Sequence, residues 1–338
     1  MTELKILNCP GTLAEGYDTY SPVALKRLFD SKKVSHILEY NSPKTSDEDA
    51  DIFNENRERI SISGVQIKYS MILEKKHLRL TREGERGRYI LKPITSDIKN
   101  SLNLPANEHL TMQIARQVFD IPIAENALIF FKEGEPAYIT KRFDYNESGD
   151  KIKQEDFASL TGRTKDTDGP DYKYNGSYEE LGETLKKYVA ASTPELEKLL
   201  DLIIFNYIFS NGDAHLKNFS LTQTADKDHI LTPAYDLLNT SLHINDNDFA
   251  LKDGLFKDGL LNGEIKEKNE PHPSKEKFRE LGKRFGLAES RVSKIIEKYS
   301  DKNEKVYKLI ENSFLDERSK RDYRYSYDRK VKYFNRIL

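Results

Sequence analysis

The feature that most constrains the fold is a helix that is apolar on almost every side. The stretch TPELEKLLDLIIFNYIFS, residues 193–210, carries Leu, Ile, Phe and Tyr on most faces of the helix. Thr193 is its predicted N-cap, and Pro194 lies in its first turn. Such a helix is stable only where other elements surround it. We therefore expect it in the interior of a large domain, which 338 residues can form as one body or as two lobes.

A short polar stretch, NGDAHLKNFS, follows this helix directly. Its Asp213 and Asn218 have the D-x-x-x-x-N spacing of a kinase catalytic loop, in which the Asp takes the proton of the attacking hydroxyl and the Asn binds magnesium. This motif alone is weak, because Asp and Asn are also common in turns. Asp236 follows at the end of a strand-like stretch, where a second magnesium-binding carboxylate is expected.

The order of residues upstream favours the kinase interpretation. Lys92 ends the predicted strand YILK, where a kinase has its phosphate-binding lysine, and Glu108 begins the next helix, where the partner of that lysine is expected. Gly64 precedes both, in a turn whose backbone N–H groups can cover phosphates. Glu108 is equally well explained as an acid favoured by the helix dipole. The chain has no G-x-G-x-x-G, and YDLLN stands in place of D-F-G, which indicates a divergent branch.

The predicted elements fall into two groups, which predicts an α+β, bilobal, protein-kinase-like fold. Residues 59–143 form a β-rich N-lobe with antiparallel strands and one helix, for which Asn107 is the predicted cap. Residues 144–338 form a mostly helical C-lobe. Residues 1–58 are an N-terminal extension, with a short helix capped by Ser21 and an acidic linker at the end.

Composition excludes several classes of protein. The 54 basic and 56 acidic residues give a net charge of −2, which does not indicate a nucleic-acid footprint. The single cysteine, Cys9, excludes an internal disulfide framework and a cysteine-based zinc site. No apolar run approaches the ~20 residues that span a bilayer, and the N-terminus lacks a secretory apolar region. We expect a cytoplasmic protein without membrane contact.

Several stretches resemble blocks of the HipA-like serine/threonine kinases, the toxins of bacterial toxin–antitoxin systems. SISGVQIKYS is similar to the S-x-x-G-x-Q-x-K loop of that family. Later blocks are matched in the same order by YILKP, NEHLTMQIAR, TKRFDY, QEDFASLTG, NGDAHLKNFSL and LTPAYDLLNT. The resemblance covers about residues 59–300. It implies a protein serine/threonine kinase that uses ATP and Mg²⁺.

The resemblance also implies roles for single residues. Asp213 is the catalytic base, with His215 beside it in the catalytic loop, and Asn218 and Asp236 bind Mg²⁺. The residues implied for ATP binding are Ser63, Gly64, Gln66, Lys68, Lys92, Phe143 and Asp144. Lys141 stands where the family usually has an acidic residue, a change that a main-chain contact to adenine tolerates. From the residues alone, His215 is either a metal ligand or a group that holds the loop by hydrogen bonds, and we prefer the second reading.

The resemblance further implies partners and regulation. Family members phosphorylate an aminoacyl-tRNA synthetase, with the tryptophanyl and glutamyl enzymes as candidates. They autophosphorylate serines of the Gly-containing loop, here Ser61 and Ser63, and this switches activity by moving the loop off the nucleotide. The added phosphate, with a charge of about −1.5 to −2, repels the phosphates of ATP unless the loop moves away. The short segment before the loop resembles the HipT type of tripartite HipBST system, which implies a HipS-like antitoxin and a HipB-like DNA-binding protein as partners. Without the resemblance, these serines are equally explained as solvent-facing residues.

Three alternatives remain open from the residues. A small-molecule phosphotransferase is possible, since antibiotic and choline kinases also use a G-D-x-x-x-x-N loop. A catalytically inactive binding module is another. The string at residues 276–299 mimics a DNA-binding helix-turn-helix, but a helical hairpin of the C-lobe gives the same string, so we expect no direct DNA contact.

Overall fold

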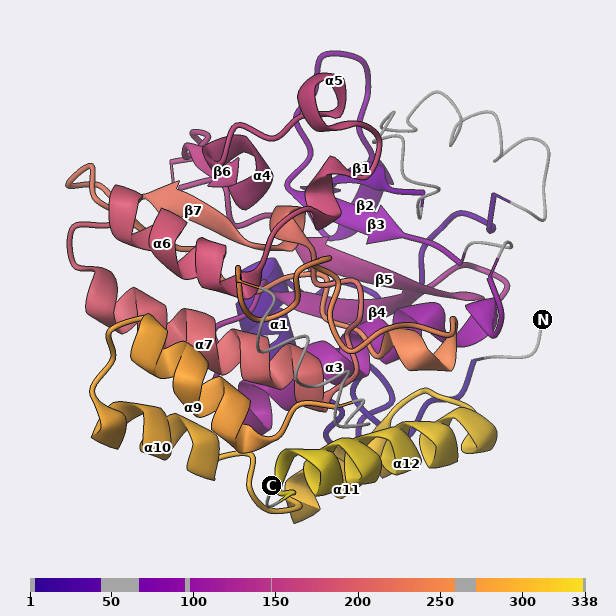
Figure 1. Ribbon diagram of the computed structural model, residues 1–338. Helices are drawn as coiled ribbons and strands as arrows, with labels where there is room; N and C mark the ends of the chain where they lie inside the picture. The colour runs from indigo at the N-terminus through magenta and orange to yellow at the C-terminus, as the bar shows by residue number, and fades with distance from the viewer. Residues whose placement is uncertain (1–3, 44–66, 95–97, 147, 259–271, 337–338) are drawn as a thin grey trace.

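The structure, a computed structural model, describes residues 4–43, 67–94, 98–146, 148–258 and 272–336. It has a β-rich N-lobe and a mostly helical C-lobe (Figure 1), as the sequence predicts. The strands are β1 (Tyr69–Glu74), β2 (His77–Leu80), β3 (Tyr89–Lys92), β4 (Asn126–Phe130), β5 (Pro136–Lys141), β6 (Gln154–Asp156), β7 (Ser220–Gln223) and β8 (His229–Leu231). The α-helices are α1 (Pro22–Phe29), α3 (Leu104–Phe119), α4 (Phe157–Leu160), α5 (Lys165–Asp168), α6 (Tyr178–Tyr188), α7 (Ser192–Ile208), α9 (Lys275–Arg284), α10 (Glu289–Glu297), α11 (Glu304–Asn312) and α12 (Glu317–Phe334). The 3₁₀ turns are η1 (Ser101–Asn103), η2 (Tyr172–Tyr174), η3 (Leu216–Asn218) and η4 (Thr240–Leu242).

The N-lobe is built on an antiparallel sheet in the order β2-β1-β3-β5-β4. At β4 both faces of this sheet are buried, and residues alternate between two cores as the period of a strand requires. In β4, Ala127 and Ile129 pack into a core shared with α1, whereas Leu128 and Phe130 pack into the core of α3 and the C-lobe. The sheet therefore joins the N-terminal segment on one side to the rest of the molecule on the other.

Helix α3 lies between the sheet and the C-lobe, and it starts earlier than predicted. Its N-cap position is Asn103, and Pro105 lies in the first turn, so the prediction of Asn107 as cap is wrong. Asn107 is instead fully buried within the helix. Its side-chain amide donates to the carbonyl of Asn239 at 2.8 Å, and its Oδ1 accepts the backbone N–H of that residue at 3.1 Å. These two bonds tie α3 to the C-lobe segment that follows Asp236.

The C-lobe is organised around α7, the predicted apolar helix. Most of its side chains are buried, and α6, α9, α10 and α12 pack around it. The helix begins at Ser192 after Ala191, so the prediction of Thr193 as N-cap is wrong by two residues. Strands β6, β7 and β8 form a second antiparallel sheet, of which only the last strand was expected.

The string at residues 276–299, which mimics a helix-turn-helix, forms a hairpin of α9 and α10 that packs on α7. Val292, Ile295 and Ile296 of α10 are buried there. This face of α10 is therefore occupied by the core of the C-lobe. Among the helices that the structure describes, none has the length and apolarity needed to cross a membrane.

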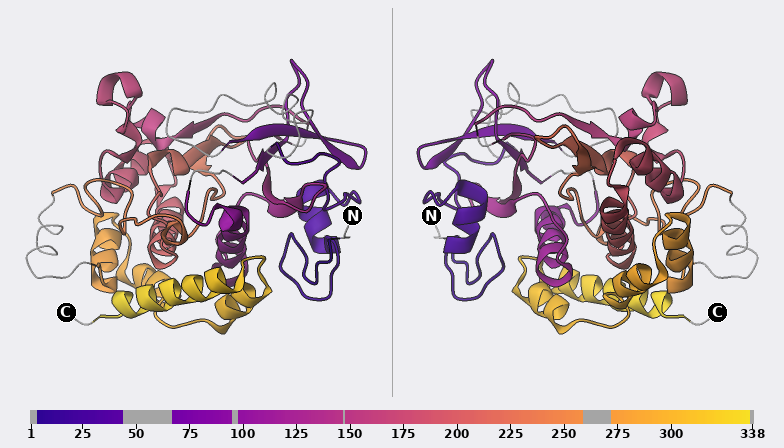
Figure 2. Two further views of the ribbon diagram at one scale, coloured as in Figure 1. Left: turned by 90° about the vertical axis from the view of Figure 1, so that its right-hand side faces the viewer. Right: turned by 90° about the vertical axis from the view of Figure 1, so that its left-hand side faces the viewer.

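The N-terminal segment covers one side of the N-lobe sheet and also reaches the C-lobe (Figure 2). Backbone bonds from Leu38 to Phe130 and from Phe130 to His36 place this segment along the edge of β4. Asn312 at the end of α11 donates to the carbonyl of Leu13 at 3.1 Å, and its own carbonyl accepts a hydrogen bond from Asn8 at 2.9 Å.

Candidate active site

The N-lobe side of the site is centred on Lys92, the last residue of β3. Its ammonium lies 2.5 Å from Oε1 of Glu108 in α3 and 2.5 Å from Oδ1 of Asp236 in the C-lobe. The side chain of Lys92 is only 4% exposed and that of Glu108 only 2%. The structure thus brings together three of the predicted site residues from three distant parts of the chain.

The pKa values of these groups reflect burial and the strong pairing. Burial alone lowers the pKa of Lys92, but Asp236 and Glu108 outweigh this and raise it. Burial raises the pKa of Asp236, but Lys92 and then Lys68 hold it well below its usual range. For Glu108 burial dominates and raises the pKa, although Lys92 opposes the shift. Asp236 is therefore the firmly ionised carboxylate of the pair.

Asp236 is fixed by the residues before it. Ala234 pairs with the segment 122–124 through two backbone hydrogen bonds of 2.8 and 2.9 Å. The hydroxyl of Tyr235 donates to the carbonyl of Lys217 at 2.8 Å, which links this segment to η3. Asp236 itself has a φ of 55°, a left-handed conformation that Asp tolerates better than most residues. Such backbone strain clusters at functional sites.

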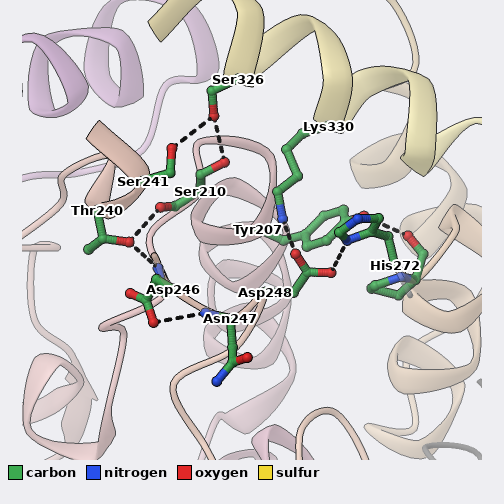
Figure 3. Close-up of polar contacts among 12 residues, drawn as sticks. Tyr207, Ser210, Thr240, Ser241, Asp246, Asn247, Asp248, His272, Ser326 and Lys330 are labelled. Carbon is green, nitrogen blue, oxygen red and sulfur yellow. Dashed lines mark hydrogen bonds and ion pairs between the residues drawn. The ribbon is translucent and has the colours of Figure 1, made fainter. Parts of the chain in front are cut away.

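The polar stretch after α7 is held by hydrogen bonds to the segment around η4 (Figure 3). The hydroxyl of Thr240 accepts the backbone N–H of Gly212 at 2.9 Å and donates to the carbonyl of Ser210 at 2.9 Å. The hydroxyl of Ser210 lies 2.8 Å from that of Ser326 in α12. Asn211 donates to Oδ1 of Asn206 at 2.8 Å, so it holds the loop against the end of α7. The buried helix and α12 thus fix where the loop can lie.

Gly212 is required by a close approach. A Cβ atom at this position would lie 2.4 Å from Oδ2 of Asp246 and 2.5 Å from the carbonyl oxygen of Asn247. Figure 3 shows Asp246 and Asn247 on the segment that runs past Thr240. The motif therefore needs glycine before Asp213 for packing reasons.

Asp213 lies half-buried in the loop that follows α7. Its Oδ1 accepts a hydrogen bond of 2.8 Å from the hydroxyl of Tyr174, in the turn η2. Burial raises the pKa of Asp213, whereas the bond from Tyr174 lowers it. One carboxylate oxygen of Asp213 is thus held in place by the turn η2.

His215 and Asn218 complete the loop. The backbone N–H of His215 donates to Oδ1 of Asn218 at 3.2 Å, and the Asn218 amide donates to Oδ2 of Asp236 at 3.4 Å. Burial lowers the pKa of His215 to about 3, so its ring is neutral at pH 7. The ring lies edge-on to Tyr174 with centroids 5.3 Å apart. Its buried Nδ1 has no hydrogen-bond partner among the described residues, so a role of the ring in holding the loop by hydrogen bonds stays a prediction.

A cleft of about 260 Å³ opens between the lobes beside these groups. Its apolar lining comes from Ile90, Ala124, Phe143 and Tyr235, and the last two rings lie 5.6 Å apart between centroids. Such a lining suits a flat aromatic base.

The connection between the lobes closes one end of this cleft. Asp144 is paired with Arg142 through bonds of 3.0 and 2.7 Å. Burial raises the pKa of Asp144, but the paired guanidinium brings it below its ordinary value. Lys141, the departure from the family pattern, pairs with Asp30 of the N-terminal segment at 2.7 Å. The positive charge of Lys141, which stands where the family usually has an acidic residue, is thus neutralised by a carboxylate of the N-terminal segment.

The oxygen donors of the cleft fit magnesium held jointly with phosphates. Asp236 offers a carboxylate, and the Asn218 amide can present its oxygen after rotation about its terminal torsion. No group of three or more His, Cys, Asp or Glu side chains within the described residues could hold a metal without other ligands. Mg²⁺ is commonly bound by one or two carboxylates together with substrate phosphates.

Four predicted residues, Ser61, Ser63, Gly64 and Gln66, lie outside the described residues. Lys68 is described, and its ammonium lies 3.9 Å from Oδ2 of Asp236. The predictions missed Tyr174 and Thr240, which hold Asp213 and Gly212. No spacing rule signals them, because they come from separate segments that meet only in the fold.

Comparison with known proteins identifies the family. The HipA-like C-terminal domain family matches residues 60–307. A protein of Haemophilus influenzae named "Putative kinase" is 26% identical over 339 aligned positions, which cover 93% of this chain and 92% of the relative. "Putative kinase Y4dM" of Sinorhizobium fredii is 32% identical over 209 positions, 58% of this chain and 48% of the relative.

Two solved structures share the fold. A chain in the complex of HipA, HipB and operator DNA, from a toxin–antitoxin system of Shewanella oneidensis MR-1, gives a TM-score of 0.59 at 19% identity. This match covers 82% of the present chain and 65% of the Shewanella chain. The proinflammatory kinase CtkA of Helicobacter pylori gives a TM-score of 0.50 at 13% identity and covers 82% and 93% of the two chains. Since the family match spans most of the sequence, this chain belongs to the family of HipA-like C-terminal domains.

Proposed function

We propose that this protein is a Mg²⁺- and ATP-dependent serine/threonine protein kinase. The observation that carries the proposal is the position of Lys92, whose ammonium is 2.5 Å from both Glu108 and Asp236. In phosphoryl transfer, a lysine of this kind binds the phosphates of ATP, and a carboxylate beside it binds the metal that neutralises them. Family membership and relatives named as kinases support the same reaction.

The chain's own groups supply the remaining steps. Asp213, with one oxygen held by Tyr174, orients the attacking hydroxyl and takes its proton. Asn218 and Asp236 hold Mg²⁺, which supplies positive charge to the phosphates when it is bound. Phe143 and Tyr235 line the place of the adenine, and Asp144, which Arg142 holds in place, is assigned to the ribose. Ser63, Gly64, Gln66 and Lys68 are assigned to the phosphates from the sequence resemblance.

The finer assignments follow the same resemblance. We assign the protein as the toxin of a toxin–antitoxin system of the HipT type, with HipS-like and HipB-like partners, that acts in the cytoplasm. The substrate is an aminoacyl-tRNA synthetase, with the tryptophanyl and glutamyl enzymes as candidates. Ser61 and Ser63 are the regulatory autophosphorylation sites. A HipA–HipB complex is the context of one structural relative, which supports a HipB-like partner.

The test is phosphorylation with labelled ATP. Wild-type protein should place label on Ser61 or Ser63 and on one purified synthetase, each located by mass spectrometry. Asp213→Ala should abolish this label and the growth arrest caused by expression, while it leaves the melting temperature almost unchanged. Label on no protein, but on an antibiotic or choline, would favour a small-molecule phosphotransferase. Activity and toxicity that survive Asp213→Ala would contradict the kinase assignment.

A further inference from the structure

The turn η2 (Tyr172–Tyr174) holds a second feature beside the hydrogen bond from Tyr174 to Asp213. It packs against η3, which carries Asn218. Between the two tyrosines stands Lys173, which is only 7% exposed. A buried lysine thus lies next to the proposed catalytic base.

Lys173 differs from the other deeply buried lysines in the part of the chain that the structure describes. Lys92 has Glu108 and Asp236, and Lys330, which is 3% exposed, pairs with Asp248. The ammonium of Lys173 has no hydrogen bond or ion pair to any described residue, and it lies 4.8 Å from the centre of the Tyr174 ring. An ammonium on a nearly buried side chain that has no such partner among the described residues can bind an anionic ligand that reaches it.

The neighbours of Lys173 place that anion beside the proposed base, because the next residue, Tyr174, donates to Asp213 at 2.8 Å and η2 packs on η3. Asp213 and Asp171 attract the Lys173 charge, whereas Lys217 and Lys68 repel it. Burial lowers the pKa of Lys173, and the attraction of Asp213 opposes this. The charges of three lysines therefore act on one another close to one proposed base, and excess positive charge of this kind suits a phosphate group.

We infer that Lys173 binds the terminal phosphoryl group of ATP while it is transferred, opposite Lys92. This inference rests on the proposed kinase function and assigns a further residue to it. In the transfer, the substrate hydroxyl oxygen forms the new bond to phosphorus and the bond to the ADP oxygen breaks. The hydroxyl proton passes to Asp213, and the Lys173 ammonium donates hydrogen bonds to the phosphoryl oxygens throughout. A cation in that place stabilises charge on the oxygens in the transition state.

The test compares binding of Mg·ATP and Mg·ADP to the full chain by calorimetry. ADP lacks the terminal phosphoryl group, so Lys173→Met should weaken Mg·ATP binding by roughly tenfold and change Mg·ADP binding by less than about twofold. Lys173→Arg keeps the charge and should recover part of the ATP preference. Retained ADP binding also shows that the variant is folded.

A matched control is Lys187→Met. Lys187 also lies over a neighbouring tyrosine, 5.2 Å from the ring centre of Tyr188, but it is exposed on α6. This variant should leave both affinities unchanged. An unchanged ratio of ATP to ADP affinity in Lys173→Met would overturn the inference, as would equal losses for both nucleotides, which indicate a packing role. Failure of wild-type protein to bind Mg·ATP would instead overturn the proposed function.

Discussion

The two sides of the site differ in whether their buried charges are paired within the protein. On the N-lobe side, Lys92 has carboxylates at 2.5 Å on two sides, so its charge is compensated inside the protein. On the C-lobe side, Asp213 has one hydrogen bond from Tyr174, and Lys173 has no anionic partner among the described residues. The first side is assembled before a ligand arrives. The second side keeps charges free for the ligand.

This difference predicts opposite effects of mutation on stability and activity. Removal of one member of a compensated buried group leaves the others uncompensated, which destabilises the fold. Removal of a charge that the fold does not compensate costs little stability and can even increase it. Mutations on the two sides should therefore separate folding from catalysis.

The largest effect on stability is expected from Lys92→Met, on the compensated side. It leaves Glu108 and Asp236 without their cation, and we expect a loss of roughly 3 kcal/mol, the lower end for buried pairs because the Asp236 side chain is 30% exposed. The free energy of unfolding in urea measures this. Lys153→Met removes an exposed partner of Glu155 at 3.6 Å and should cost less than about 1 kcal/mol. Equal losses of unfolding free energy in the two variants would show that the ion pairs of Lys92 with Glu108 and Asp236 do not stabilise the fold more than an exposed pair does.

A smaller effect is expected from Gly212→Ala, next to Asp213. The added Cβ would lie 2.4 Å from Asp246 and 2.5 Å from the Asn247 carbonyl, so the loop must move, at a cost of about 1–3 kcal/mol. Turnover should fall further than stability, because Asp213 moves with the loop. A second change, Asp246→Ala, should restore only part of both, since the carbonyl remains. A variant with wild-type turnover would contradict the role of this close approach.

The smallest effect is a shift of the pH profile by Tyr174→Phe. Burial raises the pKa of Asp213 above its ordinary value, so turnover should fall, as the pH is lowered, at a pH above that value. The bond from Tyr174 lowers this pKa, and its removal should move the acid limb of turnover to higher pH.

The ionised form of Asp213 also destabilises the fold above its pKa, so Asp213→Asn should be neutral or slightly stabilising at pH 7.

Tyr307→Phe is the control for this shift. Its hydroxyl donates to Asp328 at 2.6 Å on the surface of α11 and α12, away from the cleft. The control should leave the acid limb in place. A profile that does not change in Tyr174→Phe would indicate that this bond does not act on the catalytic base.

Local patterns predicted much of the fold. Alternation marked β1 to β5, and helical spacing with an apolar surface marked α3 and α7, because these elements are buried in the way their residues require. The order of Lys92, Glu108 and Asp236 along the chain favoured their juxtaposition, although Glu108 was equally well explained by the helix dipole, and the structure shows the contacts. The start of α3 was misplaced because Asn107 serves the lobe contact with Asn239, and a long-range bond of this kind leaves no local signal.

Long-range packing also explains what was missed in the site. Tyr174 and Lys173 come from a short turn before α6, and Thr240 comes from η4, so only the fold brings them to the catalytic loop. The β6-β7-β8 sheet has strands of three or four residues, too short for a clear alternation. Residues that support a site by contact are therefore harder to predict than those that follow a motif.

The contact between Asn8 and Asn312 has a consequence for the order of folding during synthesis. These residues are separated by 304 positions in the chain. At about 5–20 residues per second, the ribosome takes roughly 15 to 60 seconds to add the residues between them. For that time the N-terminal loop can pack only on what has already been made. The N-terminal segment and α11 can therefore be joined at this point only after Asn312 has been made, and until then this surface stays open to chaperones.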